Sequence, residues 1–147
     1  MKAILIFFLL GLTYSYNREG AANYAQKYCN NYNPEFKKYP DMIEESINFI
    51  SQCINIGGGQ DFEGCEGRDD KGMFKSVSDL KNCLVSKGWK ISYKPVKGNL
   101  VFNFVGNHVK IITGDRTDFF GKFIYCSHGP DRCSETQTPL FIEYYSP

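Results

Sequence analysis

The sequence predicts an α+β fold, in which N-terminal helices pack on an antiparallel β-sheet of about four or more strands. Two observations lead to this prediction. Apolar residues recur at helical spacing in the first half of the chain, whereas from Trp89 onward they form short β-type runs between turn residues. Helices that precede a block of strands, without alternation between the two, are typical of α+β domains.

The segment 1–15 has the pattern of a secretory signal peptide. Lys2 supplies a positive charge, a short apolar run follows, and small residues at Thr13 and Ser15 suit cleavage after Ser15. The apolar run is too short to span a bilayer. We therefore expect a secreted, extracellular protein in which residues 16–147 form a single domain with its own hydrophobic core.

The charge balance of the mature chain excludes some classes of partner. Loss of Lys2 takes the formal net charge from +1 to zero. A neutral chain without a run of basic residues does not favour binding to nucleic acid or to an anionic membrane surface.

All six cysteines lie after the expected cleavage site, and an even number in an exported chain indicates disulfides. They are Cys29, Cys53, Cys65, Cys83, Cys126 and Cys133. The sequence does not fix their pairing, but Cys126 and Cys133 flank a short loop and favour a local disulfide. Because the chain has no Cys-x-x-Cys pair and only two histidines, we expect neither a metal nor a cofactor.

Three helices are predicted in the first part of the chain. The first covers residues 19–29, with an apolar face made of Ala21, Tyr24, Ala25 and Tyr28. The second begins at Ser46, places Ile47, Ile50 and Ile54 on one stripe, and ends at the glycines 57–59, of which Gly57 suits a left-handed cap. The glycine-rich, acidic segment 60–74 reads as an irregular surface loop held by Cys65. The third helix covers residues 78–88.

Four strands are predicted in the second part, each a run of β-branched and aromatic residues bounded by turn formers. They cover residues 100–104, 108–113, 123–127 and 140–145. The order of these elements places a buried helix, which begins at Ser46, before a strand that begins at His108.

This order of elements is the one that nucleophilic catalysis needs. A nucleophile at the start of a buried helix gains from the helix dipole, and a histidine on a neighbouring strand takes its proton. A further polar group then orients that histidine. Here Ser46 would be the nucleophile and His108 the base. Asn103 is a candidate for the orienting residue. His128 could be a third member of the constellation, but we favour a surface position for it in the loop between Cys126 and Cys133. Ser46 also suits the ordinary role of a helix N-cap, and His108 that of a half-buried strand residue.

Five segments, in this order along the chain, resemble the putative amidase domain family, a relative of the NlpC/P60 and CHAP peptidoglycan hydrolases. They are Tyr-Asn-Arg at 16–18 with Ala-Ala-Asn-Tyr-Ala at 21–25, Ser-Ile-Asn-Phe-Ile-Ser-Gln at 46–52, Lys-Gly-Asn-Leu-Val-Phe at 97–102, Asn-His-Val-Lys-Ile-Ile-Thr-Gly at 107–114, and Tyr-Cys-Ser-His at 125–128. The resemblance covers nearly all of the mature chain and implies a papain-like fold that cleaves amide bonds with a cysteine nucleophile.

The chain departs from this family at its reactive positions. The family typically reads Asp-Cys-Thr-Asn-Phe-Val-Ser-Gln at the central helix and Gly-Asp before the first strand. Here Glu45 replaces the aspartate, Ser46 the cysteine, Ile47 the next polar residue and Asn99 the strand aspartate. The residues Asn48, Phe49, Ser51 and Gln52 are retained, and the resemblance makes Asn48, Gln52 and Asn103 candidate binding residues.

The replacement of cysteine by serine leaves two readings open. A serine hydroxyl is far less acidic than a thiol, so a site built for a thiolate is expected to lose activity. The chain would then be a pseudoenzyme that binds peptidoglycan or a peptide-like ligand, or a structural protein that associates with itself. In the alternative, His108 activates Ser46, and the protein is an active amidase or peptidoglycan endopeptidase.

The high tyrosine content fits several of these roles. Tyrosines could line a ligand groove, form a contact between proteins, or fill the core. They gather early and late in the chain, at Tyr24, Tyr28, Tyr32 and Tyr39 and at Tyr125, Tyr144 and Tyr145.

Overall fold

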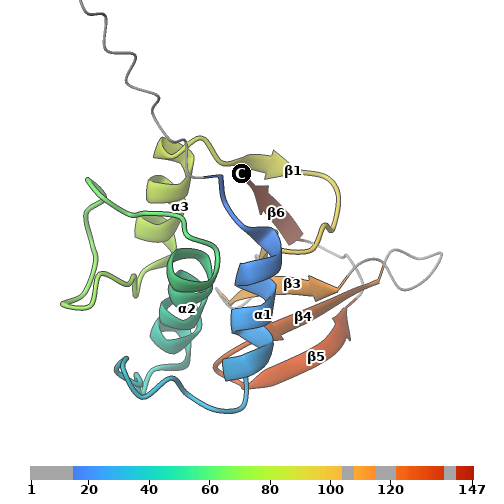
Figure 1. Cartoon of the computed structure of the whole chain (residues 1–147), viewed down its shortest axis with the longest axis horizontal. Coiled ribbons are helices and arrows are strands. Elements are labelled where there is room, and N and C mark those ends of the chain that lie inside the picture. The colour runs from blue at the N-terminus through green and yellow to red at the C-terminus, as the bar shows by residue number, and fades with distance from the viewer. Residues whose placement is uncertain (1–14, 104–107, 115–121, 138–141) are drawn as a thin grey trace, which may run out of the picture.

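A computed structural model describes residues 15–103, 108–114, 122–137 and 142–147. Within these ranges the protein has three α-helices and a six-stranded antiparallel sheet, which confirms the α+β prediction (Figure 1). Apart from Ser15, the expected signal peptide lies outside the described residues. No helix within these ranges combines the length and the apolar character that crossing a membrane requires.

The three helices lie close to their predicted positions. They are α1 (Arg18–Tyr28), α2 (Met42–Gln52), which continues into a single π-helical turn η1 (Cys53–Gly57), and α3 (Val77–Ser86). Each α-helix is capped by the side chain that precedes it: Asn17 for α1, Asp41 for α2 and Ser76 for α3.

The predicted start of the second helix is wrong by one turn. The Asp41 carboxylate accepts hydrogen bonds from the backbone N–H groups of Ile43 and Glu44, at 2.8 and 3.0 Å. This cap places Ser46 in the second turn of α2, where the helix-terminal field is weaker than at the first turn. Ser46 is therefore not an N-cap.

The sheet has the strand order β1-β6-β2-β3-β4-β5, and every neighbouring pair is antiparallel. The strands are β1 (Lys90–Ser92), β2 (Leu100–Asn103), β3 (Val109–Gly114), β4 (Phe123–Ser127), β5 (Arg132–Gln137) and β6 (Ile142–Ser146). The four predicted strands correspond to β2, β3, β4 and β6, although residues 104, 140 and 141 lie outside the described part. The edge strands β1 and β5 were not predicted.

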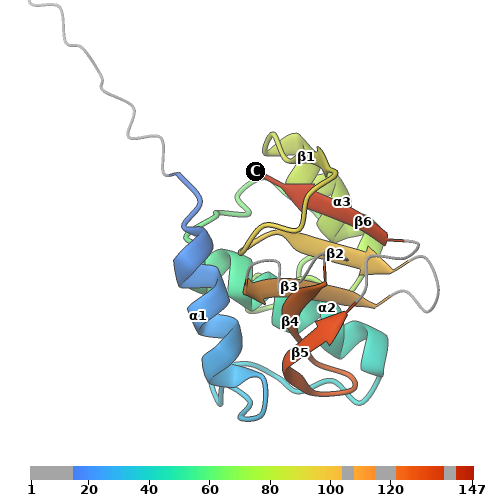
Figure 2. The same ribbon diagram turned by 90° about the vertical axis from the view of Figure 1, so that its right-hand side faces the viewer.

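The two faces of the sheet differ. Side chains from all three helices form one core with the helix-facing side of the strands, and in Figure 2 α2 and α3 lie behind the sheet. The strand residues of this core include Leu100, Phe102, Val109, Ile111, Cys126 and Tyr145. A smaller apolar cluster on the opposite face contains only strand residues, namely Val101, Ile112, Phe123, Tyr125 and Tyr144. Alternation along the strands thus assigns each residue to one face.

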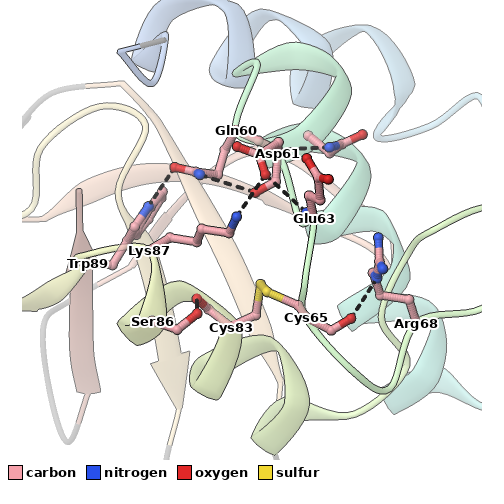
Figure 3. A network of polar contacts seen from close by, with 10 residues as sticks. Gln60, Asp61, Glu63, Cys65, Arg68, Cys83, Ser86, Lys87 and Trp89 are labelled. Atoms are coloured by element: carbon pink, nitrogen blue, oxygen red, sulfur yellow. Dashed lines mark hydrogen bonds and ion pairs between the residues drawn. A yellow bond between two sulfur atoms is a disulfide. The ribbon is translucent and has the colours of Figure 1, made fainter. Parts of the chain in front are cut away.

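A disulfide between Cys65 and Cys83 fastens the segment 60–74 to α3. The Lys87 ammonium also contacts the Asp61 carboxylate at 2.7 Å, and the indole N–H of Trp89 donates to the side chain of Gln60 (Figure 3). The prediction of a surface loop is only partly right, because this segment also sends apolar side chains into the protein. Those of Phe62, Met73 and Phe74 are buried.

The predicted pairing of Cys126 with Cys133 is wrong. Cys133 on β5 instead forms a disulfide with Cys29, the residue that follows α1. Cys126 is a buried free thiol that donates to Thr113 Oγ1, and Cys53 is also free and buried. The physical reason is that Cys133 lies on the edge strand, where the end of α1 reaches it, so the disulfide joins helix to sheet.

Gly57, one of the three glycines that end the second helix, lies where the backbones of η1 and α1 approach closely. A Cβ on Gly57 would collide with the Gly20 carbonyl and with Tyr24 of α1. The left-handed conformation occurs at Gly59, with φ 70°, rather than at Gly57 as predicted. Gly57 therefore serves the contact between η1 and α1.

Candidate functional site

The Ser46 hydroxyl is bound to the backbone of β3. Its Oγ donates to the Val109 carbonyl at 2.9 Å and accepts from the Val109 N–H at 3.2 Å. The described pairing between β3 and β4 begins at Ile111 and does not include Val109. The Ser46 hydroxyl therefore binds the N–H and C=O of Val109, which in a longer strand pair would bind β4. Ser46 is 0% exposed. Its environment is that of a structural hydroxyl.

His108 lies on the other side of this strand. Because Val109 faces the helices, its neighbours His108 and Lys110 face away from them. His108 is half-buried and lines a cavity of about 180 Å³ together with Asn103 and Tyr125, which lie on the same face. The structure therefore does not bring Ser46 and His108 together as nucleophile and base.

The expectation that His128 is a surface loop residue is wrong, because it is buried beside Glu45 and Phe49 of α2. Its Nδ1 lies 2.8 Å from Glu45 Oε1, and its Nε2 lies 2.9 Å from the Tyr28 carbonyl oxygen, to which it donates. The ring stacks on Phe49 with centroids 3.7 Å apart, and Tyr32 packs on it at 4.2 Å. Both ring nitrogens are thus occupied, so neither is available to take a proton from a serine.

Glu45 anchors a second segment besides His128. Its Oε2 accepts from the backbone N–H of Tyr39 at 2.7 Å, so both carboxylate oxygens have partners. Glu45 is 3% exposed and His128 is 2% exposed. A buried charge is tolerated when it is paired and hydrogen-bonded, as here. The pair ties the start of α2 to the end of β4 and to the loop before α2.

The loop after His128 covers the start of α2. Gly129 lies so close to the Met42 carbonyl that a Cβ there would collide with it. A cavity of about 290 Å³ is open at this end of α2, and Glu45 and Gly129 form part of its wall. Ser46 does not line this cavity. A ligand in it would therefore not touch the serine hydroxyl.

The retained polar residues of α2 form a buried hydrogen-bond network. The Asn48 Nδ2 donates to the Asp69 carboxylate at 3.0 Å, and Gln52 Nε2 donates to Asn48 Oδ1 at 2.7 Å. Gln52 in turn accepts from the Tyr24 hydroxyl at 2.9 Å. Because their polar atoms bind other residues of the chain, Asn48 and Gln52 have structural partners rather than a free surface for a ligand.

Ser51 and Asn99 have similar roles. Ser51 Oγ donates to the Ile47 carbonyl and accepts from the Phe74 N–H, which fixes the segment 60–74 on α2. The Asn99 side chain accepts from the Arg18 guanidinium and is completely buried. The contact with the Arg18 cation is therefore made by a neutral amide.

Most of the tyrosines belong to the core. Those with at most 9% exposure are Tyr24, Tyr39, Tyr125, Tyr144 and Tyr145, whereas Tyr28 and Tyr32 are half-buried. Burial raises the pKa of Tyr39 and of Tyr144 to about 12. The core role accounts for five of the nine described tyrosines, and Tyr32 forms part of the wall of the cavity at the start of α2.

Potential metal ligands come together at one place in the described part of the chain. The sulfur atoms of Cys29, Cys126 and Cys133 lie within 4.8 Å of one another. Since Cys29 and Cys133 are joined in a disulfide, Cys126 alone keeps a thiol there. Burial raises the pKa of this thiol, which disfavours the thiolate that binds metals.

The sequence did not indicate the structural roles of Glu45 and Asp69, which hold other residues of this region in place. Glu45 was noted only as a replacement, and Asp69, which binds Asn48 and the Tyr39 hydroxyl, was assigned to a surface loop. The resemblance gave one signal for Glu45, because it stands where the family has an aspartate. No local pattern marks Asp69.

Comparison with known proteins agrees with the sequence motifs. Residues 15–115 match the family described as a putative amidase domain. The chain is 44% identical over 105 residues to the uncharacterized protein YhbB of Bacillus subtilis (strain 168). This match covers 71% of the chain and 32% of the Bacillus protein, so the chain spans about a third of that relative. No solved structure matches the chain. The chain therefore belongs to the putative amidase domain family.

Proposed function

We propose that the protein is a secreted pseudoenzyme of this family, descended from papain-like NlpC/P60 hydrolases, that binds peptidoglycan or a peptide-like ligand without cleaving it. The observation that carries the proposal is the engagement of Ser46. Its hydroxyl proton is donated to the Val109 carbonyl, and its oxygen accepts from the Val109 N–H. A nucleophile needs a free lone pair aimed at the substrate and a base that takes its proton.

The positions of the two histidines also argue against the active alternative. His108 faces away from α2, and both nitrogens of His128 have hydrogen-bond partners within the protein. Among the described residues, no side chain that could act as a base hydrogen-bonds to Ser46. Ser46 is also completely buried, so an acyl-enzyme on its hydroxyl would require neighbouring segments to move.

The edges of the sheet favour a binding role over self-assembly. The edge strand β1 has three residues, and Lys90 and Lys94 flank the exposed side chains of Ile91 in the strand and Tyr93 just after it. The other edge, β5, carries charged residues and is joined to α1 by a disulfide. Short and charged edge strands oppose pairing between sheets of separate molecules.

The test is a hydrolysis assay combined with a binding assay. Purified wild-type protein, Ser46→Cys and Ser46→Ala are incubated with peptidoglycan, with an active cell-wall amidase as a positive control. We expect no released fragments from any of the three proteins, and co-sedimentation of each with peptidoglycan. The cysteine variant stays inactive because His108 is on the wrong face of β3. Release of fragments by wild-type protein but not by Ser46→Ala would contradict the proposal.

A further inference from the structure

A basic cavity opens on the face of the sheet opposite α1, α2 and α3. It has a volume of about 180 Å³, and its walls include Asn103 on β2, His108 and Lys110 at β3, Tyr125 on β4 and Arg132 on β5. Ligand sites for drug-sized molecules measure roughly 300–1,000 Å³, so this cavity suits a group the size of one amino acid.

The positive charge in this cavity exceeds the negative charge. Arg132 has a carboxylate partner, Glu135, at 3.0 Å, whereas the Lys110 ammonium has a neutral one, the Gln137 side chain, at 2.6 Å. Lys110 also lies 4.1 Å from the centroid of the Tyr125 ring. Burial, and after it the charge of Arg132, lower the pKa of Lys110. The charge of Glu135 offsets part of the effect of Arg132 on Lys110, and an anion in the cavity would relieve the remaining repulsion between the two cations.

An unpaired acceptor lies in the same wall. Asn103 Oδ1 is buried and has no hydrogen-bond partner among the residues that the structure describes. An unsatisfied buried acceptor is unfavourable and is explained by a donor that binds there. A suitable ligand therefore carries a negative group for Lys110 and Arg132 and an N–H group for Asn103.

From this geometry we infer that the cavity between Asn103, Lys110 and Arg132 binds the C-terminal end of a peptide-like ligand. The carboxylate lies between the Lys110 ammonium and the Arg132 guanidinium, and the amide N–H of the terminal residue donates to Asn103 Oδ1. His108 forms part of this binding wall and takes no part in hydrolysis. The inference rests on the proposed binding function and specifies its site and its ligand.

The probe is racemic N-acetylalanine, which holds a carboxylate and an amide N–H at the spacing of a peptide end. It is titrated into ¹⁵N-labelled protein while the backbone amide shifts of β3 and β5 are followed. N-acetylalaninamide removes the carboxylate, O-acetyllactate removes the N–H, and inorganic phosphate supplies an anion of another class. We expect saturable shifts with N-acetylalanine, an affinity at least tenfold weaker for the amide, and about fivefold weaker for O-acetyllactate.

The variants Lys110→Gln and Arg132→Gln should each weaken binding of N-acetylalanine at least tenfold. Lys90→Gln is the matched control, because Lys90 is an exposed lysine on β1, outside the cavity. It should bind as the wild-type protein does. Thermal melting of each variant checks that it is folded, and if a variant is unfolded the comparison of the probes still tests the inference.

Several results would overturn this site. They are an absence of binding, equal affinity for N-acetylalaninamide or O-acetyllactate, tighter binding of phosphate, and unchanged affinity in folded Lys110→Gln and Arg132→Gln. None of these results would restore catalysis to Ser46. Conversely, cleavage of peptidoglycan that depends on Ser46 would contradict the proposed function even if the cavity binds the probe.

Discussion

Replacement of Ser46 by alanine should destabilise the protein substantially if the hydroxyl is structural. The substitution leaves the N–H and the C=O of Val109 without the partner they have in the wild-type protein. Both groups lie next to a serine that is 0% exposed, so water does not readily replace the hydroxyl.

The expected size follows from the cost of unsatisfied buried polar groups. Each costs about 1–3 kcal/mol, and partial relaxation lowers the sum, so we expect a loss of about 3 kcal/mol in the free energy of unfolding. For a domain of this size about 1 kcal/mol corresponds to a shift of roughly 3–4 °C in the melting temperature, which gives a decrease of about 10 °C.

Urea unfolding and thermal melting, both followed by circular dichroism, measure this loss. Ser86→Ala is the control, because Ser86 is an exposed serine whose hydroxyl also donates to a backbone carbonyl, that of Cys83. It should change stability by less than about 0.5 kcal/mol. If Ser46→Ala were as stable as Ser86→Ala, or more stable than the wild-type protein, the structural role of the hydroxyl would be refuted.

Three other predictions concern buried groups. Glu45→Leu leaves the imidazole of His128 without its carboxylate partner and should lower the free energy of unfolding, measured in urea, by about 3–5 kcal/mol. A decrease below about 1 kcal/mol would contradict the structural role of this buried pair. Burial raises the pKa values of the free thiols of Cys53 and Cys126, so iodoacetamide at pH 8 should not label the folded protein. After denaturation without reductant it should alkylate two thiols, which intact mass measures. Labelling of the folded protein would disprove this prediction. Burial raises the pKa of Tyr144 from 10.0 to about 12, so its contribution to stability is complete below pH 10 and is lost as the pH rises towards 12. Urea midpoints should therefore fall less steeply over this range in Tyr144→Phe, and equal slopes would argue against it.

Much of the fold could be predicted because its signals are local. Helical periodicity located α1, α2 and α3, and β-branched and aromatic runs located the four inner strands. The edge strands β1 and β5 were missed because β1 has only three residues and β5 is polar apart from its cysteine. Pairing with a neighbouring strand, rather than local sequence, makes them strands.

The candidate site was harder to predict because it depends on orientation across the sheet. The motif around Ser46 identified the family. The face to which His108 points, however, depends on which residues of β3 face the helices, and this is known only once Val109 is seen to be buried against them. The Cys126 pairing failed for a related reason, since the partner of Cys133 comes from α1, 104 residues away along the chain. Contacts between distant segments leave no mark in a local pattern.

Native-state hydrogen exchange at the amide of Val109 tests most directly whether the serine of α2 completes the sheet. We expect this amide to be protected in the wild-type protein to nearly the same degree as Ile111, and to exchange much faster in Ser46→Ala while Ile111 stays protected. An amide of Val109 that exchanges freely in the wild-type protein, or equally in both proteins, would contradict the account and leave the hydroxyl available for chemistry.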